Sequence, residues 1–536
     1  MGRRRRAGRC VAATALSTIL ALSWASLIPA QARPPDTLPL PKATACPSAA
    51  GEPIMHKHDL RGVWIATVAN VDWPSKPGLT AATQQAELTS WLDMVQRLNM
   101  NAVMLQVRPA ADAFWPSRLE PWSKYLTGTQ GTDPGYDPLA VAVQQAHQRG
   151  LALHAWFNPF RVSMNTDISA LAPDHPARVH PEWIVNYNGK LYYNPGLPEV
   201  RDFVTQVIME SVTKYDIDGV HFDDYFYPYP GGGKPFDDAD AFARYGQGFA
   251  SRADWRRANI DAFMKNLHEQ IQRSRPEVVL GVSPFAVWRN ASTDPAGSPT
   301  RGGVETFDDL YADTRKWVRE GWIDYIAPQI YWSRGHPLAD YDTLVRWWST
   351  EVDAARAAGH DVALIIGEAT YKAGVDSDKA WQDPAELSRH LEFTAPLPQV
   401  QGNIYFSAKD VRADRLNSTS RLVQDWYTRP ALVPVMANPT GTAPKRPRSV
   451  NRTRRVLAFS ARDPRTTAFA IYRVKGKAPQ SCDLADARQL VAVVPRASGT
   501  QTWRSPTPPK GSTFVVTAID RSGRESAGVI ARTSRR

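Results

Sequence analysis

The feature that most constrains the fold of this 536-residue chain is a series of short apolar, β-rich runs that alternate with helical segments. Strands are expected at eight places, namely 62–68, 102–107, 151–157, 219–223, 279–285, 325–331, 362–367 and 403–406. Between them, apolar residues recur at helical spacing, as Leu88, Trp91, Leu92, Val95 and Leu98 do. Eight β units, each followed by a helical segment, predict an α/β fold, the (β/α)8 barrel of the TIM type.

The pattern changes after Trp426. A proline-rich stretch predicts a linker, and short strands are expected beyond it. The run Phe514 to Asp520 is similar to a late strand of a fibronectin type III domain, which indicates a small C-terminal β-sandwich of that kind. The predicted division is 1–32 signal peptide, 33–58 N-terminal extension, 59–429 barrel, 430–447 linker and 448–536 sandwich.

An export signal is predicted at the N-terminus. The apolar run Val11 to Ala30 follows five arginines and ends in the small-x-small pattern Ala30-Gln31-Ala32. An uncleaved anchor is the alternative. Cleavage leaves Cys46 and Cys482, which an oxidising compartment would allow to pair or to remain free. We expect an exported protein, periplasmic or secreted and associated with the cell envelope, with no transmembrane segment after signal cleavage.

Charge is divided along the chain. Residues 445–536 hold 20 Lys and Arg against 5 Asp and Glu, whereas residues 33–444 are net negative. For an exported protein, an anionic envelope surface is the partner that suits this basic segment. Nucleic acid and a merely solvated basic face are the alternatives, and we expect no nucleic-acid partner.

Residues of unusual chemistry gather at the predicted strand ends. In a (β/α)8 barrel the active site lies on the face at the carboxyl ends of the strands. Residues at or just past these ends are Trp64, Arg108, Asn158, Arg161, Asp223, Asp224, Gln329, Tyr331, Trp332 and Glu368. Core packing explains one or two of them but not the whole set.

The sharpest local feature is the segment IDGVHFDDY at 217–225. Alternation along a strand turns His221 and Asp223 inward and Phe222 toward the covering helices, with Asp224 just past the strand. Two adjacent carboxylates in a cleft push their pKa values apart. Glycoside hydrolysis requires that split, because one group must be anionic and another protonated.

A structural role and a metal-binding role both stay open for this segment. The aspartates could cap the next helix or pair with a local arginine, and His221 with Asp223 could bind a metal, although no HxH or HExxH pattern is near. Adjacent carboxyls rarely flank one glycosidic bond, so a partner acid is needed. Glu368 is the first choice, which makes the predicted catalytic set Asp223, Asp224 and Glu368. The further candidates are Asp112, Glu120, Asp294 and Glu305.

Aromatic residues suit a sugar-binding cleft. The chain has 18 Trp, and the apolar faces of sugar rings stack on such planes, although core packing explains about half of them. Polar neighbours would bind hydroxyl, acetamido or carboxylate groups. The predicted substrate-binding residues are Trp64, Arg108, Asn158, Arg161, His221, Tyr225, Trp288, Gln329, Tyr331 and Trp332.

Several motifs together resemble the glycosyl-hydrolase-like 10 family, also labelled domain of unknown function 187. They are RGVW at 61–64, QVRP at 106–109, HAWFNP at 154–159, DGVHFDDY at 218–225, GVSPF at 281–285, WRN at 288–290 and GWIDYIAPQIYW at 321–332. The resemblance spans 59–427. It implies a (β/α)8 barrel in the cell envelope and a relative that cuts peptidoglycan glycan strands stripped of stem peptides. It also implies that Asp223 and Asp224 are catalytic, with Asn158, Gln329 and Tyr331 along the cleft.

The function that these observations predict is an exported glycoside hydrolase. Its expected substrate is an amino-sugar polysaccharide, with peptidoglycan glycan strands lacking stem peptides as the first choice, and no cofactor or metal is expected. Two alternatives belong to other classes. One is a carbohydrate-binding envelope protein whose barrel has lost catalysis, and the other is a metal-dependent hydrolase.

Overall fold

The computed structural model describes residues 37–41, 55–436, 441–476, 478–506 and 511–533. The described residues all belong to one compact unit, Asp36–Arg536. The predicted signal peptide and Cys46 lie outside the described residues, whereas Cys482 is disulfide-bonded. Within the described ranges, no helix combines the length and apolar character needed to cross a membrane.

Eight parallel strands form a closed barrel, which confirms the predicted (β/α)8 fold. Each strand pairs with the next along the chain, and the last pairs with the first. The strands are β2 (Leu60–Ile65), β3 (Ala102–Arg108), β4 (Ala152–Phe157), β8 (Gly219–Phe222), β9 (Val279–Val282), β10 (Tyr325–Ile326), β11 (Ala363–Glu368) and β12 (Val400–Tyr405).

Strands β9 and β10 are shorter than the sequence predicts. Pro284 and Pro328 follow them and lack the N–H that a continuous ladder needs. Isolated parallel bridges continue the barrel wall beyond these prolines, from Phe285 to Gln329 and from Gln329 to Gly367. The wall is therefore extended at the mouth by bridges in place of regular strands.

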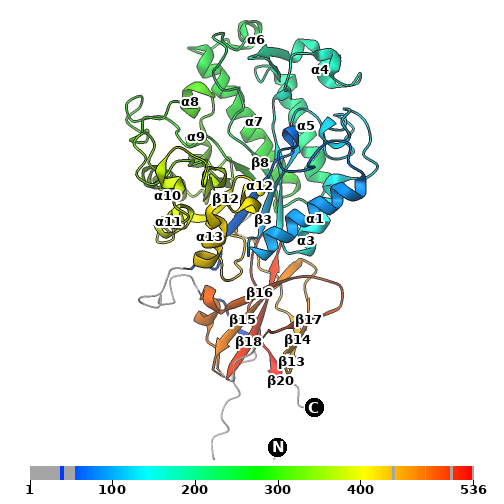
Figure 1. Cartoon of the computed structure of the whole chain (residues 1–536), viewed down its shortest axis with the longest axis vertical. Coiled ribbons are helices and arrows are strands. Elements are labelled where there is room, and N and C mark those ends of the chain that lie inside the picture. The colour runs from blue at the N-terminus through cyan, green and yellow to red at the C-terminus, as the bar shows by residue number, and fades with distance from the viewer. Residues whose placement is uncertain (1–36, 42–54, 437–440, 477, 507–510, 534–536) are drawn as a thin grey trace, which may run out of the picture. The chain divides into compact units, whose positions relative to one another are not determined.

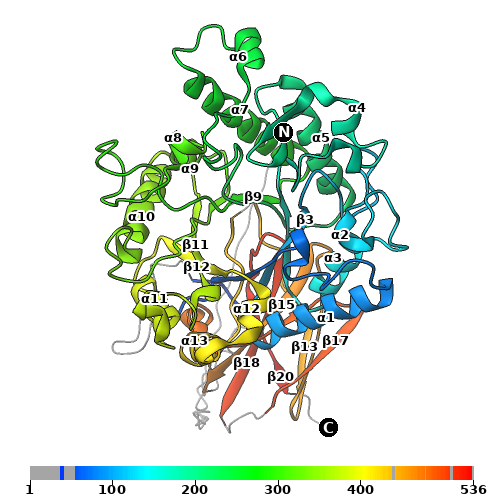
Figure 2. The ribbon, with the colours of Figure 1, turned by 45° about the horizontal axis from the view of Figure 1, so that its top comes forward.

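Helices surround the barrel strands (Figures 1 and 2). The longer ones are α1 (Ala81–Arg97), α3 (Pro138–Gln148), α5 (Pro198–Lys214), α7 (Arg252–Ser274), α10 (Tyr341–Ala357), α11 (Glu386–Thr394) and α13 (Ser418–Trp426). Shorter helices are α2 (Lys124–Thr127), α4 (Pro176–Val179), α6 (Ala239–Tyr245), α8 (Thr306–Asp309), α9 (Thr314–Arg319) and α12 (Ala408–Ala413). Side-chain caps start several of them; the Asp340 carboxylate, for example, accepts from the Thr343 N–H at the start of α10. A small sheet of β5 (Arg161–Ser163), β6 (Ile184–Tyr187) and β7 (Lys190–Tyr193) follows β4.

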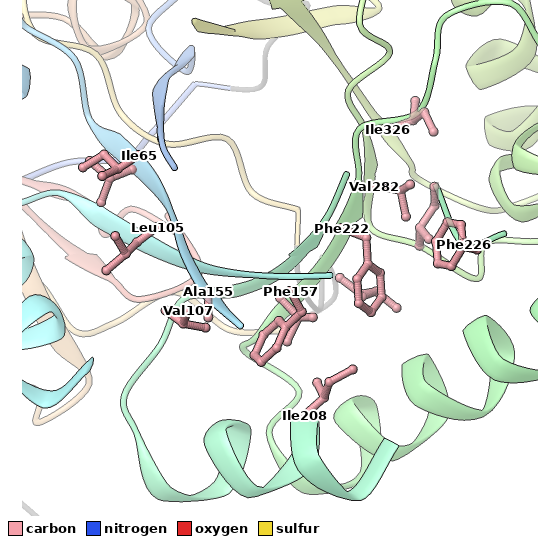
Figure 3. Packing of buried hydrophobic residues seen from close by; sticks show 14 of the residues in the cluster. Ile65, Leu105, Val107, Ala155, Phe157, Ile208, Phe222, Phe226, Val282 and Ile326 are labelled. Atoms are coloured by element: carbon pink, nitrogen blue, oxygen red, sulfur yellow. The ribbon is translucent and has the colours of Figure 1, made fainter. Parts of the chain in front are cut away.

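Alternating strand residues separate two cores. One core lies between the strands and the helices, where Phe157 and Phe222 are directed toward Ile208 of α5 (Figure 3). The other fills the barrel interior and includes Trp64 and Trp156. This alternation confirms the orientation predicted for β8 and leaves its carboxyl end open toward the mouth.

The C-terminal part is a β-sandwich of two sheets with a shared core of Phe459, Phe469, Ile471, Phe514 and Val516. One sheet has the order β1-β19-β18-β15-β16 and the other β17-β14-β13-β20. The bounds are β1 (Thr37–Leu38), β13 (Arg448–Thr453), β14 (Val456–Ser460), β15 (Thr466–Lys475), β16 (Leu490–Pro495), β17 (Thr500–Arg504), β18 (Ser512–Asp520), β19 (Gly528–Ile530) and β20 (Arg532–Thr533). The fibronectin type III assignment stays a prediction. The sequence did not predict β1, through which the N-terminal extension joins this domain.

An ion-paired carboxylate connects the barrel to the sandwich. The Arg521 side chain contacts Asp216 and donates from Nε to Asp218 Oδ1 at 3.1 Å. Asp218 Oδ2 accepts from the Leu153 N–H and pairs with His147 Nε2, each at 2.8 Å. Burial alone would raise the pKa of Asp218, but the His147 hydrogen bond and the charges of His147 and Arg521 lower it to about 2.

Candidate active site

Two neighbouring carboxylates stand at the carboxyl end of β8. Asp223 turns inward at the mouth and is 9% exposed, and its Oδ2 accepts a 2.5 Å hydrogen bond from Asn158 Nδ2. Its Oδ1 is buried and has no hydrogen-bond partner. Asp224 is half-buried and accepts a hydrogen bond from the Tyr229 hydroxyl. The structure thus brings the predicted pair into one site.

A hydrogen-bond network fixes the orientation of Asn158. Its Oδ1 accepts from Gln106 Nε2 at 2.9 Å and from Arg161 Nη2 at 2.5 Å, which leaves its Nδ2 directed at Asp223. Gln106 is held in turn because its Oε1 accepts from the backbone N–H of Thr67 at 3.0 Å and Val68 at 2.8 Å. The network therefore joins the ends of four neighbouring strands, β2, β3, β4 and β8.

Arg161 places a positive charge beside the acidic pair. Its guanidinium donates to the Pro109 carbonyl at 2.7 Å and lies over the Tyr225 ring, 5.5 Å from its centre. These contacts leave Arg161 only 8% exposed. Predicted site residues Asn158, Arg161 and Tyr225 therefore all border the aspartates.

Burial and mutual repulsion keep a proton on the pair. Burial, together with the charge of Asp224, raises the pKa of Asp223 to about 7, and Arg161 and the hydrogen bonds of Asn158 and Trp156 oppose this rise. Burial also raises the pKa of Asp224, against the hydrogen bond from Tyr229. Because the two carboxyls interact, they titrate as a unit, and that unit holds one proton near neutral pH.

His221 and Trp64 form the floor of the site. The Trp64 indole donates to His221 Nε2 at 2.9 Å, and His221 Nδ1 lies 2.8 Å from the Tyr325 hydroxyl. Burial lowers the pKa of His221 well below its usual value, so the ring is neutral. With exposures of 0% and 2%, His221 and Trp64 lie beneath the site, and this geometry does not support the substrate contacts predicted for them.

The floor also bears on the metal alternative. Both His221 nitrogens are already engaged, which leaves no free lone pair to join Asp223 in binding a metal. Within the part of the chain that the structure describes, no group of three or more His, Cys, Asp or Glu side chains is arranged to hold a metal ion.

Aromatic side chains border the other side of the pair. The Tyr229 ring meets Phe285 edge-on at 6.5 Å, and Phe285 meets Trp332 at 5.5 Å. Tyr331 is half-buried; burial raises its pKa well above the usual value, and the charges of both aspartates contribute. Gln329 is also half-buried and donates to the Ser283 carbonyl at 3.0 Å. Predicted residues Gln329, Tyr331 and Trp332 are therefore accessible near the mouth.

Glu368 lies behind the barrel wall. It shares the helix-facing side of β11 with Ile366, and its side chain is completely buried. Its carboxylate accepts from the Tyr341 hydroxyl and Asn403 Nδ2, both at 2.8 Å, and pairs with His390 Nδ1 at 2.8 Å. A catalytic group must touch the substrate. The geometry therefore favours a structural role for Glu368 over the predicted catalytic one.

Arg108 and Trp288 are also placed away from the mouth. Arg108 is completely buried and forms a bidentate ion pair with Glu120 at 2.5 and 2.7 Å. Trp288 is 4% exposed, donates to Asp313 Oδ1 and stacks on Trp347. Substrate contacts were predicted for both, but these positions favour structural roles.

Three residues of the site were not among the predicted set. Gln106 orients Asn158, Tyr229 donates to Asp224, and the Trp156 indole N–H is buried beside Asp223 without a hydrogen-bond partner. A signal existed for Gln106, because it follows the inward-facing Met104 by two residues along β3. Tyr229 lies in the loop that follows β8. In a loop, the spacing of residues along the sequence does not predict which way a side chain points.

Comparisons with known proteins identify a matching family, related sequences and a similar solved structure. Residues 59–383 match the family described as Glycosyl hydrolase-like 10. The chain is 46% identical over 481 residues to Glycosyl hydrolase YngK of Bacillus subtilis (strain 168), covering 87% of this chain and 92% of that protein. It is 40% identical over 405 residues to Glycosyl hydrolase DigH of Escherichia coli (strain K12), covering 72% and 89%. A similar solved structure is the glycoside hydrolase domain of PgaB (BpsB) from Bordetella bronchiseptica, with a TM-score of 0.47, 14% identity and coverage of 69% of this chain and 98% of that one.

Proposed function

The chain belongs to the glycosyl hydrolase-like 10 family and is a glycoside hydrolase; from this premise we propose that it cuts O-glycosidic bonds in an amino-sugar polysaccharide. The substrate we propose is the peptidoglycan glycan strand without stem peptides, met after export into the cell envelope. The observation that carries the proposal is the Asp223–Asp224 pair, partly accessible at the barrel mouth and holding one proton.

The pair has the two forms that glycoside hydrolysis needs. One carboxyl gives its proton to the glycosidic oxygen as the bond breaks, and the other stays anionic beside the positive charge that develops at the anomeric carbon. The pKa of about 7 at Asp223 suits proton donation to the glycosidic oxygen by the pair. A general acid is most effective when its pKa is close to the working pH. Asn158 and Arg161 hold Asp223 in place and limit how far its pKa rises.

The surroundings of the pair suit a polysaccharide. Tyr225, Tyr331 and Trp332 are half-buried, so each keeps part of its ring accessible for stacking against a sugar face. Gln329 and Arg161 supply amide and guanidinium groups for hydroxyl and acetamido oxygens. This combination of stacking planes and fixed polar groups supports a sugar chain as the ligand.

Digestion of purified glycan strands tests the proposal. Strands with and without stem peptides are incubated with the protein, and the products are identified by mass spectrometry. We expect fragments from the peptide-free strands, with the rate falling at least about 100-fold in Asp223→Asn. Asp294→Asn is the matched control, because Asp294 is ion-paired to Arg289 in the loop after β9.

Two results would overturn the proposal. One is that neither kind of strand is cut while Asp223→Asn binds glycan as the unaltered protein does, which would identify a carbohydrate-binding protein. The other is that Asp223→Asn cuts as fast as the unaltered protein. Loss of activity on adding a chelator, restored by a divalent metal, would identify a metal-dependent hydrolase.

We also propose that the sandwich binds an anionic phosphodiester polymer of the envelope. Its surface has a hollow of about 520 Å³, and no acidic residue of the described chain lines it. The exposed cations around it are Arg446, Arg448, Arg462 and Arg532. Closely spaced guanidinium groups bind phosphates in succession and release counterions, so the affinity should fall with salt.

Co-sedimentation with purified teichoic acid at two salt concentrations tests this surface. The variant Arg446→Glu, Arg448→Glu, Arg462→Glu should bind at least about 10-fold more weakly than the unaltered protein. A control reverses the charge of three exposed barrel residues, Lys76, Arg118 and Arg273. Equal weakening in both variants would show that net charge acts alone, without a defined site.

A further inference from the structure

The two aspartates stand next to each other at one side of the barrel mouth. They are consecutive residues at the end of β8, and the hydrogen bonds from Asn158 to Asp223 and from Tyr229 to Asp224 hold them there. A glycosidase that uses two carboxylates, one as acid and one as nucleophile or base, places them at least about 5 Å apart across the scissile bond. The group that attacks the anomeric carbon must therefore come from elsewhere.

Three of the other acids that the sequence offers are covered. Glu368 is buried behind the wall. Glu120 is completely buried as the ion-pair partner of Arg108. Asp112 is 0% exposed and accepts a 3.4 Å hydrogen bond from Gln130. These three side chains are covered, whereas Asp223 keeps 9% of its surface exposed, so a substrate reaches Asp223 more readily than any of them.

The remaining two acids are engaged in the loop after β9. Asp294 is ion-paired to Arg289 at 2.9 Å. Glu305 Oε1 accepts hydrogen bonds from the Asn290 N–H and Thr293 Oγ1, and from the Asn290 side chain. Across the described residues, four of these five carboxylates are held by partners, and the fifth, Asp112, keeps an unpartnered Oδ1 but is 0% exposed.

The deepest part of the site offers one acceptor and one donor to a ligand. Neither Asp223 Oδ1 nor Trp156 Nε1 has a well-formed hydrogen bond, although the indole lies close enough to the carboxylate to lower the pKa of Asp223. A buried polar group without a well-formed hydrogen bond destabilises the site, so a ligand that pairs with these atoms is favoured. An amide carries the complement, an N–H and a carbonyl. The Trp156 ring, which meets His221 edge-on and is 5% exposed, gives the apolar cover that an acetyl methyl needs.

We infer that the substrate itself supplies the nucleophile, through the 2-acetamido group of the sugar whose bond is cut. In this scheme Asp223 accepts the amide N–H and aligns the acetamido group, and Asp224, nearer the rim, acts as the acid. The inference rests on the proposed function and deepens it, because it restricts the substrate to glycans that are N-acetylated at the cleaved sugar.

The reaction then runs in two balanced steps. The acetamido carbonyl oxygen bonds to the anomeric carbon as the bond to the leaving oxygen breaks, and that oxygen takes the proton from Asp224. The product is an oxazolinium ion whose N–H is held by the Asp223 carboxylate. A water molecule then gives a proton to Asp224 and attacks the anomeric carbon, the oxazoline C–O bond breaks, and the acetamido group is restored. Two inversions leave the anomeric configuration retained.

The proton that the two carboxyls share fits these two roles, in which Asp223 aligns the acetamido group and Asp224 acts as the acid. In the free protein, burial raises the pKa of both carboxyls, which share the proton. An amide N–H donated to Asp223 stabilises its anion, and the proton then favours Asp224. Binding of the substrate would thus carry the proton to the carboxyl that stands beside the leaving group.

Three measurements on the unaltered protein test the inference. Peptide-free strands are compared before and after chemical de-N-acetylation, the first anomer formed is followed by proton NMR, and the bicyclic thiazoline of N-acetylglucosamine is tried as an inhibitor. We expect at least about 100-fold slower cutting after de-N-acetylation, retention of configuration and competitive inhibition. An inverted first product, or equal cutting of both strands, would overturn the inference and leave the proposed function standing. If no strand is cut, the proposed function itself fails.

Variants separate the two roles. On an aryl N-acetylglucosaminide whose leaving group needs no proton, Asp224→Asn should keep most of its activity, whereas Asp223→Asn should lose at least about 100-fold. Asp112→Asn is the control, and it should stay within about threefold of the unaltered protein once circular dichroism shows that it is folded. A 100-fold loss in folded Asp112→Asn would identify Asp112 as an enzymic nucleophile and overturn the inference.

Discussion

Asn158 Nδ2 donates a 2.5 Å hydrogen bond to Asp223 Oδ2 and so joins the ends of β4 and β8, which are adjacent in the barrel. The same amide accepts from Gln106 and Arg161, so its orientation is fixed from two sides. This hydrogen bond favours the anionic form of Asp223 against burial, which favours the neutral form. The balance between them sets the pH range in which the pair holds one proton.

Replacing Asn158 with alanine should shift the pH dependence of activity. The lost hydrogen bond stabilised the anion, so the pKa of the pair rises, and the basic limb of kcat/KM should move up by about one pH unit. We also expect kcat to fall about 10-fold because Asp223 is less well oriented. Asn186→Ala, at an exposed position of β6, is the control. A basic limb that stays in place or moves to lower pH would contradict the account.

Glu368→Gln should affect stability more than catalysis. Burial lowers the pKa of His390, but the charges and hydrogen bonds of Glu368 and Glu386 raise it to about 9, so the variant leaves a buried cation with one of its two partners. Losing one member of a buried pair costs about 3 kcal/mol of unfolding free energy, measurable by urea denaturation. At temperatures where the variant is folded, kcat should stay within about threefold. A kcat lowered 100-fold with unchanged stability would return Glu368 to the catalytic set.

The contact between barrel and sandwich should weaken in acid. The pKa of Asp218 in the folded protein is lowered to about 2, below its unfolded value, so the carboxylate stabilises the fold above that unfolded value. This contribution, about 2 kcal/mol, is lost as the pH falls from about 5 toward 2. Asp218→Asn should lower the thermal midpoint at pH 7 and show a flatter dependence on pH below 5. If the thermal midpoint depends on pH in the same way in the variant and in the unaltered protein, Asp218 does not make this contribution to stability.

Trp332→Ala should weaken substrate binding with little effect on the chemical step. Its half-buried ring packs against Phe285, which in turn meets Tyr229 beside Asp224. Losing one stacking plane should raise KM about 10-fold while kcat changes less than about threefold. Trp347→Ala is a matched control, because its ring stacks on the buried Trp288. An equal rise of KM in both variants would remove Trp332 from the proposed binding surface.

The barrel and the inward turn of Asp223 could be predicted because the underlying patterns are unambiguous. Eight apolar runs separated by helical spacing fit few other folds. Alternation along 219–223 placed His221 and Asp223 on the face opposite Phe222, as the structure has them. The helix-facing position of Glu368 could not be predicted in this way. The run before it is apolar on both faces, so it carries no alternation that would orient the next residue.

The position of Arg108 depends on an irregularity that the sequence does not indicate. The pairing of β3 with β4 shifts register between Gln106 and Arg108, which alters the alternation at the strand end. Gln106 keeps the inward direction and contacts Asn158, while Arg108 is buried against Glu120, 12 residues further along the chain. Its position at a strand end therefore made Arg108 look like a substrate-binding residue, although its partner in the structure is Glu120.

The central claim is that the Asp223–Asp224 pair holds one proton near neutral pH, and infrared difference titration tests it most directly. The carboxylic acid band is followed from pH 4 to 9 in the unaltered protein, in Asp223→Asn and in the control Asp294→Asn. We predict a band that disappears with a midpoint at about pH 7 in the unaltered protein and the control. In Asp223→Asn this transition should be absent, because the carboxyl whose pKa is raised to about 7 by burial and by the charge of Asp224 has been replaced. A site whose carboxyls are all ionised by pH 5 would contradict the account.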